Sequence, residues 1–153
     1  MRKILFTFAL LLFNFSIYCQ VTVTVEYKTK FVCNKKFGLD IKDGNFLMTV
    51  IYDDKNLKFN SYTGQKMSEF TIIKITEKYI IGKDENGNFS FFNINEKQFY
   101  YIDFYMNSYI TAGHGASYSE IKQTVLYMSK MLDEGKSQKE VIQYLIEQST
   151  YEY

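Results

Sequence analysis

The sequence contains no proline and no tryptophan, and it has only one histidine and two cysteines among 153 residues. With one histidine, a metal site would need carboxylate partners, and a general base would need a nucleophile or an acid nearby. The sequence shows no recognisable catalytic triad, metal-ligand cluster, phosphate-binding loop or paired-carboxylate motif. These absences argue against an enzyme, and we expect neither a cofactor nor a bound metal.

An excess of charge of one sign is also missing. The chain has 18 Lys and Arg residues against 17 Asp and Glu residues, a formal net charge of +1. Loss of the first 19 residues would remove Arg2 and Lys3 and leave 16 basic and 17 acidic residues. A chain without a basic excess cannot neutralise many phosphates, so we expect no nucleic-acid partner.

Apart from the N-terminus, the sequence has no long hydrophobic run. Two basic residues at positions 2 and 3 precede an apolar run over residues 4–13, and a polar Asn14 follows it. This order is typical of a secretory signal peptide, and the run is too short to cross a hydrocarbon core of ~30 Å comfortably. We therefore predict a signal peptide over residues 1–19, with an uncleaved membrane-anchoring helix as the alternative. The mature chain should have no membrane span and should be periplasmic or extracellular.

Cleavage is predicted between Cys19 and Gln20. A leader that ends in this way resembles the leaders of exported proteins from Bacteroidetes-type bacteria, and the resemblance covers only the leader. The alternative is lipidation of Cys19, which would make an outer-membrane lipoprotein, but the bulky Tyr18 fits a lipobox poorly. Only Cys33 remains after cleavage, which excludes an intramolecular disulfide. We expect Cys33 to be buried and inert rather than paired with a partner chain.

Residues 21–110 carry short segments rich in β-branched and aromatic side chains, separated by turn residues. The first of them alternates valine and threonine, the period of a half-buried strand. The connections are too short for helical crossovers, so neighbouring strands should pair antiparallel. We predict a meander of about eight strands over residues 20–110, either a barrel or a strongly twisted sheet. The segments are VTVTVEY, KFGLDI, NFLMTVIY, NLKFNSY, EFTIIKI, YIIGKD, NFSFFNI and QFYYIDFYM.

A weak internal repeat lays residues 56–67 over residues 88–99, an offset of 32. Leu57 matches Phe89 and Phe59 matches Phe91 in this alignment. The pattern resembles a β-propeller blade, but two copies cannot close a propeller, which needs at least ~4 blades. We interpret the repeat as two hairpins of one meander.

The pattern becomes helical after residue 117. Ser117 with Glu120, and Ser137 with Glu140, each form the S-x-x-E pattern of a capping box. Gly135 is a suitable residue for the end of the first helix. Apolar residues at helical spacing follow each box: Ile121, Val125, Met128 and Leu132, then Val141, Ile142, Leu145 and Ile146.

These signals predict an α+β fold in which a helical hairpin follows the meander. The two helices should span residues 118–133 and 138–149. We assign residues 111–117 to a linker and residues 118–153 to the hairpin, which should pack on the β part.

The single histidine lies in the small-residue stretch GHGAS at 113–117. His114 is a candidate base, and the flanking glycines are candidates for binding an anion through backbone amides at the helix start. Small residues before a capped helix are also what a strand-to-helix joint requires. We favour the joint and keep His114 as a candidate binding residue.

The aromatic stretch FYYIDFYMNSY at 99–109 is a second candidate site. Strand alternation places Tyr101, Asp103 and Tyr105, together with Phe99, on one face, and a more apolar set on the other. The first face should be half-solvated, and tyrosine buries area at a low entropy cost. Tyr101, Asp103 and Tyr105 are therefore candidate binding residues, with an ordinary sheet face as the alternative.

Two short motifs resemble known sites only in part. DENGNFS at 84–90 resembles a calcium loop, but Phe89 and Asn95 stand where an EF-hand has glycine and glutamate. We predict a hairpin turn there. The helix–GKS–helix pattern at 131–148 resembles a helix-turn-helix DNA reader. It also resembles the helical hairpin of periplasmic cytochrome c maturation proteins, whose Cys-x-x-Cys pair is missing here.

The sequence therefore predicts a small, exported, non-catalytic binding or interaction protein of the bacterial envelope, with a protein partner. The alternative is a carrier of a small apolar ligand, in which inward aromatic side chains of a lipocalin-like barrel line a cavity. The chain has no tryptophan, so it lacks the Gly-x-Trp signature of lipocalins. An enzyme that uses His114 is the third and least favoured reading.

Overall fold

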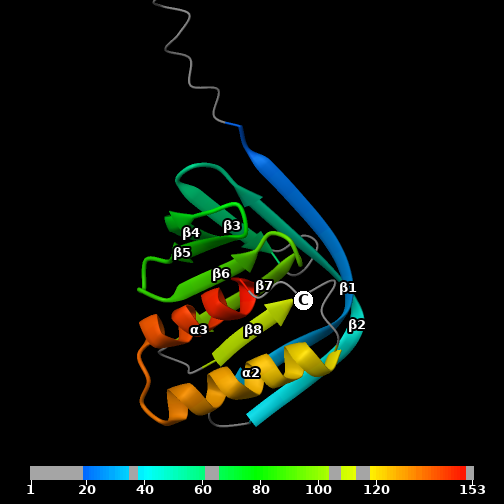
Figure 1. Ribbon diagram of the computed structural model, residues 1–153. Coiled ribbons are helices and arrows are strands. Elements are labelled where there is room, and N and C mark those ends of the chain that lie inside the picture. The colour runs from blue at the N-terminus through cyan, green and yellow to red at the C-terminus, as the bar shows by residue number, and fades with distance from the viewer. Residues whose placement is uncertain (1–18, 35–37, 61–65, 104–107, 113–117, 151–153) are drawn as a thin grey trace, which may run out of the picture.

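The computed structural model describes residues 19–34, 38–60, 66–103, 108–112 and 118–150, and these contain eight strands followed by two helices (Figure 1). The prediction of an α+β fold with an antiparallel meander and a C-terminal helical hairpin is confirmed. Both helices lie within one residue of their predicted ranges. The strands are β1 (Val21–Asn34), β2 (Gly38–Tyr52), β3 (Asn56–Asn60), β4 (Ser68–Ile75), β5 (Tyr79–Lys83), β6 (Phe89–Asn93), β7 (Gln98–Asp103) and β8 (Ser108–Ala112), and the helices are α2 (Tyr118–Asp133) and α3 (Gln138–Thr150).

Each strand pairs antiparallel with the next one along the chain, and the order of neighbours closes on itself. The long strand β1 pairs with β2 from Val21 opposite Tyr52 to Asn34 opposite Gly38. Only residues 30–34 of β1 also pair with β8. The sheet is therefore strongly curled, and its two edges meet as a barrel along the C-terminal part of β1 (Figure 1).

Several strand boundaries differ from the prediction, and β1 continues beyond VTVTVEY to Asn34. Residues 43–45, predicted as a turn between two strands, lie inside the single strand β2. Between Tyr27 and Thr29 the β1 register advances two residues while β2 advances three, from Phe46 to Asp43. The turn-forming residues are thus absorbed as a β-bulge, which needs one extra residue on one strand. In addition, β8 was not predicted as a separate strand, and it extends to Ala112, into the segment predicted as a linker.

The inside of the curled sheet is packed with apolar side chains. Phe99 is fully buried there, and its ring stacks on Phe59 with centroids 3.8 Å apart. The rings of Phe70 and Phe92 also contact Phe99. Close packing of this kind is the normal way in which a small barrel fills its interior. The buried members of this interior cluster are Val25, Met48, Val50, Leu57, Phe59, Phe70, Ile80, Phe92 and Phe99.

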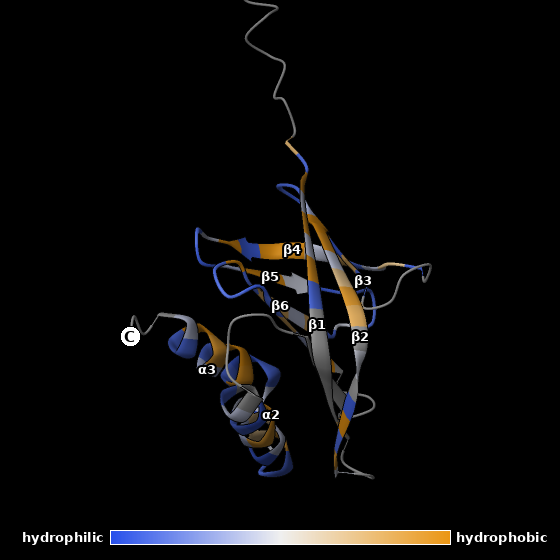
Figure 2. Ribbon diagram, turned by 90° about the vertical axis from the view of Figure 1, so that its right-hand side faces the viewer, coloured by the Kyte–Doolittle hydropathy of each residue, from blue (hydrophilic) through white to orange (hydrophobic). Residues whose placement is uncertain are grey.

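The outer face of β5, β6 and β7 is covered by the two helices, which lie on one side of the sheet (Figure 2). Phe91 and Tyr100 alternate with the interior residues and contribute to this second cluster. Strands β6 and β7 are therefore buried on both faces. The buried members of this helix-facing cluster are Cys33, Tyr79, Ile81, Phe91, Tyr100, Ile102, Val125, Met128, Val141, Ile142 and Leu145.

Cys33 lies in the helix-facing cluster with 2% of its surface exposed, which confirms the prediction of a buried thiol. The thiol is within hydrogen-bond distance of the Ser129 hydroxyl, with Sγ and Oγ 3.4 Å apart. This contact joins β1 to α2 across the helix-facing cluster.

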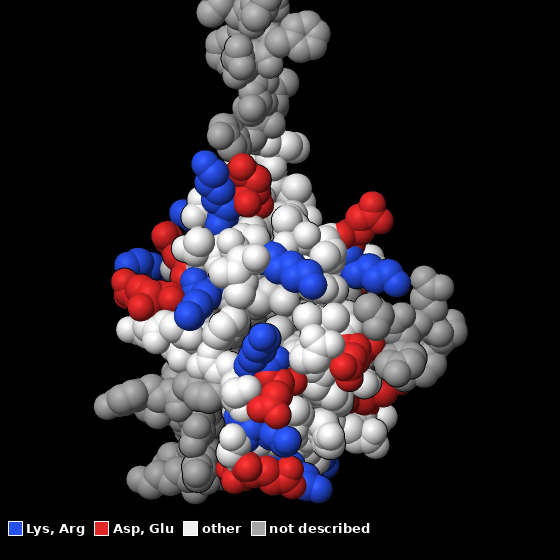
Figure 3. Space-filling model, turned by 60° about the vertical axis from the view of Figure 1, so that its left-hand side comes forward, with Lys and Arg blue, Asp and Glu red and all other residues white. Residues whose placement is uncertain are grey.

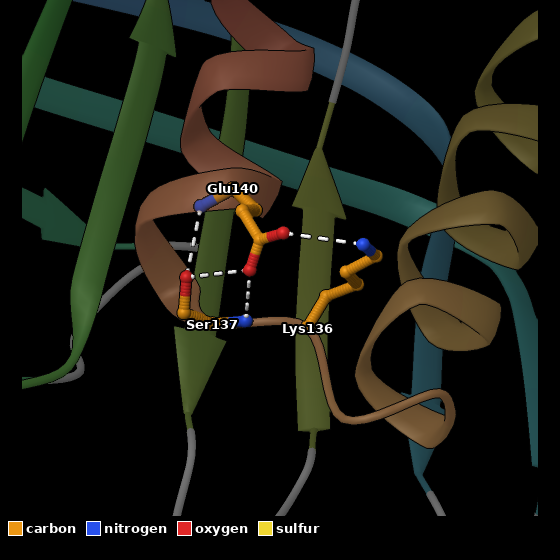
Figure 4. A network of polar contacts seen from close by, with 3 residues as sticks. All are labelled: Lys136, Ser137 and Glu140. Carbon is orange, nitrogen blue, oxygen red and sulfur yellow. Dashed lines mark hydrogen bonds and ion pairs between the residues drawn. The ribbon is translucent and has the colours of Figure 1, made fainter.

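The joint between the helices has the predicted chemistry. Gly135 adopts a left-handed φ of 79°, and the amide of Lys136 donates to the carbonyl of Met131, which closes the end of α2. At the start of α3, the Ser137 amide donates to the Glu140 carboxylate at 2.8 Å (Figure 4). The Glu140 amide donates to the Ser137 hydroxyl at 3.3 Å. The second capping box is confirmed, whereas Ser117 of the first lies outside the described residues.

We expect Ser137→Ala to lower the free energy of unfolding by about 1 kcal/mol, because it removes the acceptor for the first turn of α3. Urea unfolding followed by circular dichroism measures this loss. Ser68→Ala, at an exposed position that begins β4, is the matched control and should change stability by less than about 0.5 kcal/mol. Equal losses in the two variants would show that the cap contributes nothing.

No helix of the described residues is long and apolar enough to cross a membrane. Basic and acidic side chains lie interspersed over the described residues of the face shown in Figure 3. Lys58 and Glu69, for example, form an exposed ion pair between β3 and β4 at 3.2 Å. The two signs of charge are thus mixed on this face rather than gathered into a single patch.

Candidate functional site

The structure describes only part of the predicted tyrosine face. Tyr101 is half-buried in β7, and its hydroxyl lies 3.1 Å from both the Asp84 carboxylate and the Asn88 side-chain amide. Asp103 ends β7 opposite Ser108, but its side chain lies outside the described part of the structure. Tyr105 and His114 fall in residues 104–107 and 113–117, which are also outside it. The structure therefore describes the side chain of one of these four candidates, and the grouping of the four stays a prediction.

Of the face that was predicted to be half-solvated, the structure describes the side chains of Phe99 and Tyr101, and Phe99 departs from the prediction whereas Tyr101 is half-buried. Phe99 on this face is fully buried, because the sheet curls and turns the face into the barrel. Tyr101 packs its ring on Phe70 there, with centroids 5.8 Å apart. Its hydroxyl contacts the β5–β6 turn, where the Asn88 amide donates to Asp84 at 2.8 Å. The motif at 84–90 is thus a hairpin turn, as predicted.

A different set of polar residues forms a cleft where α2 and α3 meet the β6–β7 hairpin. The cleft has a volume of about 170 Å³. Carboxylates, amides and hydroxyls dominate its walls, and tyrosine rings complete them. The lining residues are Asn93, Glu96, Gln98, Tyr100, Glu120, Gln123, Thr124, Tyr144, Leu145, Gln148 and Ser149.

The cleft begins where the helix-facing side of the sheet changes from apolar to polar. Asn93 and Gln98 pair across β6 and β7 and are 6% and 3% exposed. The Asn93 side chain accepts a hydrogen bond from the Glu96 amide at 3.1 Å, which fixes the turn. Lys97 completes the turn with a left-handed φ of 54°. This hairpin geometry places Glu96 at the exposed rim of the cleft.

Gln98 is the chemically unusual residue of the cleft. Its Oε1 atom accepts a hydrogen bond of 2.7 Å from the Tyr100 hydroxyl. Its Nε2 atom is buried, and none of the described residues accepts a hydrogen bond from it. A buried donor without an acceptor costs about 1–3 kcal/mol, and such a group in a folded protein calls for an explanation.

The electrostatics of the cleft are set by Glu96 and Glu120. Partial desolvation of the carboxyl group raises the pKa of Glu96 above its ordinary value, although the residue is exposed, and the Glu120 charge raises it further. On the opposite wall, burial raises the pKa of Tyr144, and a hydrogen bond with Thr124 opposes this shift. None of the described lining residues is Lys, Arg or His, so the cleft carries negative charge at neutral pH.

The raised pKa of Glu96 predicts a pH-dependent effect on stability. Between the ordinary and the raised pKa the folded protein binds more protons than the unfolded chain, so stability falls as pH rises through this window. We expect Glu96→Gln to raise the free energy of unfolding by a few tenths of a kcal/mol at neutral pH. The gain is small because solvent screens a carboxylate at the rim of the cleft. The gain should vanish below the ordinary glutamate pKa.

Urea unfolding of the wild type and the Glu96→Gln variant at both pH values measures this gain. Glu85→Gln, in the exposed β5–β6 turn, is the matched control and should show no comparable gain. A Glu96→Gln variant that is less stable at neutral pH would contradict the inferred repulsion with Glu120.

This cleft was not predicted from the sequence, because Glu120 was assigned to helix capping and no pattern singled out Glu96. One signal was present: Gln98 shares a strand face with Tyr100 and Ile102, which makes it a polar residue in an otherwise apolar row. Comparison with known proteins adds nothing here, because no protein-family model, curated protein or solved structure matches the chain.

Proposed function

We propose that this chain is a small non-catalytic binding protein of the bacterial envelope, and that the cleft between the β6–β7 hairpin and the helices binds its ligand. The observation that carries the proposal is the cleft itself, whose lining, Gln98 included, consists mainly of residues with carboxylate, amide and hydroxyl groups. Binding sites commonly combine a concave surface with a few polar groups that fix the orientation of the ligand. The cleft has this composition.

Envelope localisation is the part of the proposal that rests on the leader. Basic residues, a short apolar run and a polar break at 1–19 are typical of export. Mass spectrometry of the protein isolated from its native host tests this part. A mass that begins at Gln20 is expected. Acyl mass on Cys19 would indicate a lipoprotein, an uncleaved chain would overturn export, and a second chain in the native spectrum would identify a protein partner.

The apolar-ligand carrier is less well supported by the packing. Its ligand would have to lie inside the barrel, where Phe59 and Phe70 both contact Phe99 and all three are at most 7% exposed. A carrier needs an apolar cavity at this place. The interior cluster leaves the helix-side cleft as the better candidate for ligand binding.

Chemical-shift mapping with a library of small polar and apolar compounds tests the cleft. We expect polar compounds to shift the side-chain amide of Gln98 and the resonances of neighbouring cleft residues. Gln98→Leu should abolish this response. Gln143→Leu, at an exposed position of α3 outside the cleft lining, is the matched control and should retain it.

Two outcomes would count against the proposal. Equal binding by wild type and Gln98→Leu would show that the unpartnered amide has no role. Shifts caused by a fatty acid such as palmitate and centred on Phe59 and Phe99 would instead favour the carrier.

A further inference from the structure

We infer that the N-terminal part of β1 is a pairing edge, at which the β1 strands of two copies of this chain join antiparallel into one continuous sheet. The edge consists of residues 21–27, VTVTVEY, and is called the β1 edge below. It lies outside the cleft lining, so the inference does not depend on the proposed ligand site.

The β1 edge has a strand on one side only among the described residues. All seven of its residues pair with residues 46–52 of β2. Strand β8 pairs with β1 only over residues 30–34, and Figure 2 shows both helices away from the N-terminal end of β1. In an antiparallel ladder, alternate residues point their backbone N–H and C=O groups to opposite sides. Every second residue of the β1 edge therefore offers a donor and an acceptor to a further strand.

The β1 edge has none of the features that protect a strand edge from pairing. Natural edges are guarded by lysine, by proline, by a short strand or by a bulge. The stretch VTVTVEY contains neither lysine nor proline, and β1 has 14 residues. The bulge of this strand lies beyond the β1 edge, between Tyr27 and Thr29. Valine and threonine instead favour the extended conformation that pairing requires.

The sequence of the β1 edge is complementary to itself, which favours a second copy as the partner. Thr24 is the middle of the seven residues that precede the bulge, so full antiparallel overlap places it opposite Thr24 of the second copy. Val23 then lies opposite Val25 of the second copy, and Thr22 lies opposite Glu26. The contact is isologous, as a two-fold dimer requires. Threonine faces threonine, valine faces valine, and the only charged residue does not face its own copy.

Pairing of two copies would also cover apolar surface beside the β1 edge. Val25 is 5% exposed in the interior cluster, whereas Val21 on the same face of the strand is 36% exposed. Val23, which lies between them, is partly buried against the same cluster. In the proposed register Val23 packs beside Val25 of the second copy, so the inner faces of the two sheets become continuous. The added strand therefore satisfies backbone groups and buries valine side chains at the same place.

The length of the β1 edge sets the expected strength of the dimer. Seven residues at ~3.3 Å each give a paired length of about 23 Å. A contact of this size is small among specific interfaces, so we expect a Kd of about 1–100 μM. Assembly should stop at the dimer, because the two-fold contact uses the β1 edge of both copies.

Sedimentation velocity and hydrogen exchange together test the pairing. The protein is expressed with its own leader, so that it carries the N-terminus that the host produces. Sedimentation from about 1 μM to 1 mM should show a concentration-dependent dimer and no larger species. Hydrogen exchange followed by nuclear magnetic resonance should show alternate amides of residues 21–27 becoming protected as the dimer forms.

Charge substitutions at Thr22 test the register. Thr22→Lys places a lysine opposite Glu26 of the second copy, twice in each dimer, and should tighten the dimer about threefold at low ionic strength. Thr22→Glu places two carboxylates opposite each other and should weaken the dimer about threefold. Adding Glu26→Lys to Thr22→Glu should restore the dimer, because opposite charges then meet again. Thr71→Glu, at an exposed position of β4 with strands on both sides, is the matched control and should leave the dimer unchanged.

Three results would overturn the inference. A protein that stays monomeric up to about 1 mM does not pair with itself. A dimer whose affinity does not depend on the charge at Thr22 uses another surface. If a different chain bound to the host protein protects the alternate amides of residues 21–27, the β1 edge binds a strand of that partner instead of a second copy. All three results leave the proposed ligand binding in the cleft untouched.

Discussion

Replacing Phe99 with alanine is expected to lower the free energy of unfolding by about 3–5 kcal/mol. Phe99 is fully buried in the interior cluster, and its ring stacks on Phe59 at 3.8 Å. It also contacts the rings of Phe70 at 5.9 Å and Phe92 at 6.5 Å. Removing the ring deletes these contacts and leaves a cavity that the surrounding strands cannot fully close. Urea unfolding followed by circular dichroism measures the loss.

Two further variants make this expectation specific. Phe99→Leu should lower the free energy of unfolding much less, by about 1–2 kcal/mol, because leucine keeps most of the volume of the phenylalanine side chain. Tyr127→Ala removes an aromatic ring from an exposed position on α2, where 48% of the residue is accessible. It should cost less than about 1.5 kcal/mol, even with its contact to the Tyr144 ring. Similar losses for Phe99→Ala and Tyr127→Ala would show that the barrel interior is not the main core.

The same variant tests the carrier alternative. An apolar cavity made by Phe99→Ala should stay dry and bind a small apolar molecule such as benzene. The wild type should not bind benzene in the barrel, because Phe99 and its neighbours occupy that space. If benzene shifted the resonances of Phe59 and Phe92 in the wild type, the apolar-ligand carrier would be the better supported function.

The fold was predictable where its signals are local. Strand alternation, turn residues and the Ser137–Glu140 capping box each act over a few residues, so the meander and the helices could be placed from the sequence. Closure of the sheet was not predictable, because it depends on pairs such as Lys30 with Ala112, which are far apart in the chain. The short β8 was missed for the same reason.

The internal repeat shows a second limit of the sequence. Leu57 and Phe59 lie in the interior cluster, whereas their aligned partners Phe89 and Phe91 belong to the helix-facing side. Alternation specifies which residues share a face, but it does not say where that face points. In strands buried on both sides, such as β6, both faces are apolar and the pattern is ambiguous.

The cleft was less predictable than the fold. Its carboxylates lie 24 positions apart, in a turn and in a helix, and each has an ordinary local explanation. Only the packing of α2 and α3 against the β6–β7 hairpin brings Glu96, Glu120 and Gln98 to one place. The polar Gln98 in an apolar strand row was a signal for a site, but it does not define the ligand.

We expect Gly82→Ala to lower the free energy of unfolding by about 2–3 kcal/mol through overpacking. Gly82 is buried in β5 opposite Ser90, and an added methyl group would lie 2.7 Å from Phe70 Cβ and 2.8 Å from Ser90 Oγ. Both distances are shorter than a normal van der Waals contact of a methyl carbon with a carbon or an oxygen atom. Phe70 Cβ is held by its own backbone, so β4 must shift, whereas Ser90 Oγ can rotate. Urea unfolding measures the cost.

The control and a double variant separate the two contacts. Gly44→Ala meets only the tip of the Phe46 ring at 3.3 Å, at an exposed position, and should change stability by less than about 1 kcal/mol. Adding Ser90→Ala to Gly82→Ala removes the contact with the hydroxyl and keeps the contact with Phe70. Since the fixed Phe70 atom dominates, the double variant should recover less than half of the loss. Full recovery would show instead that the serine hydroxyl excludes a side chain at position 82.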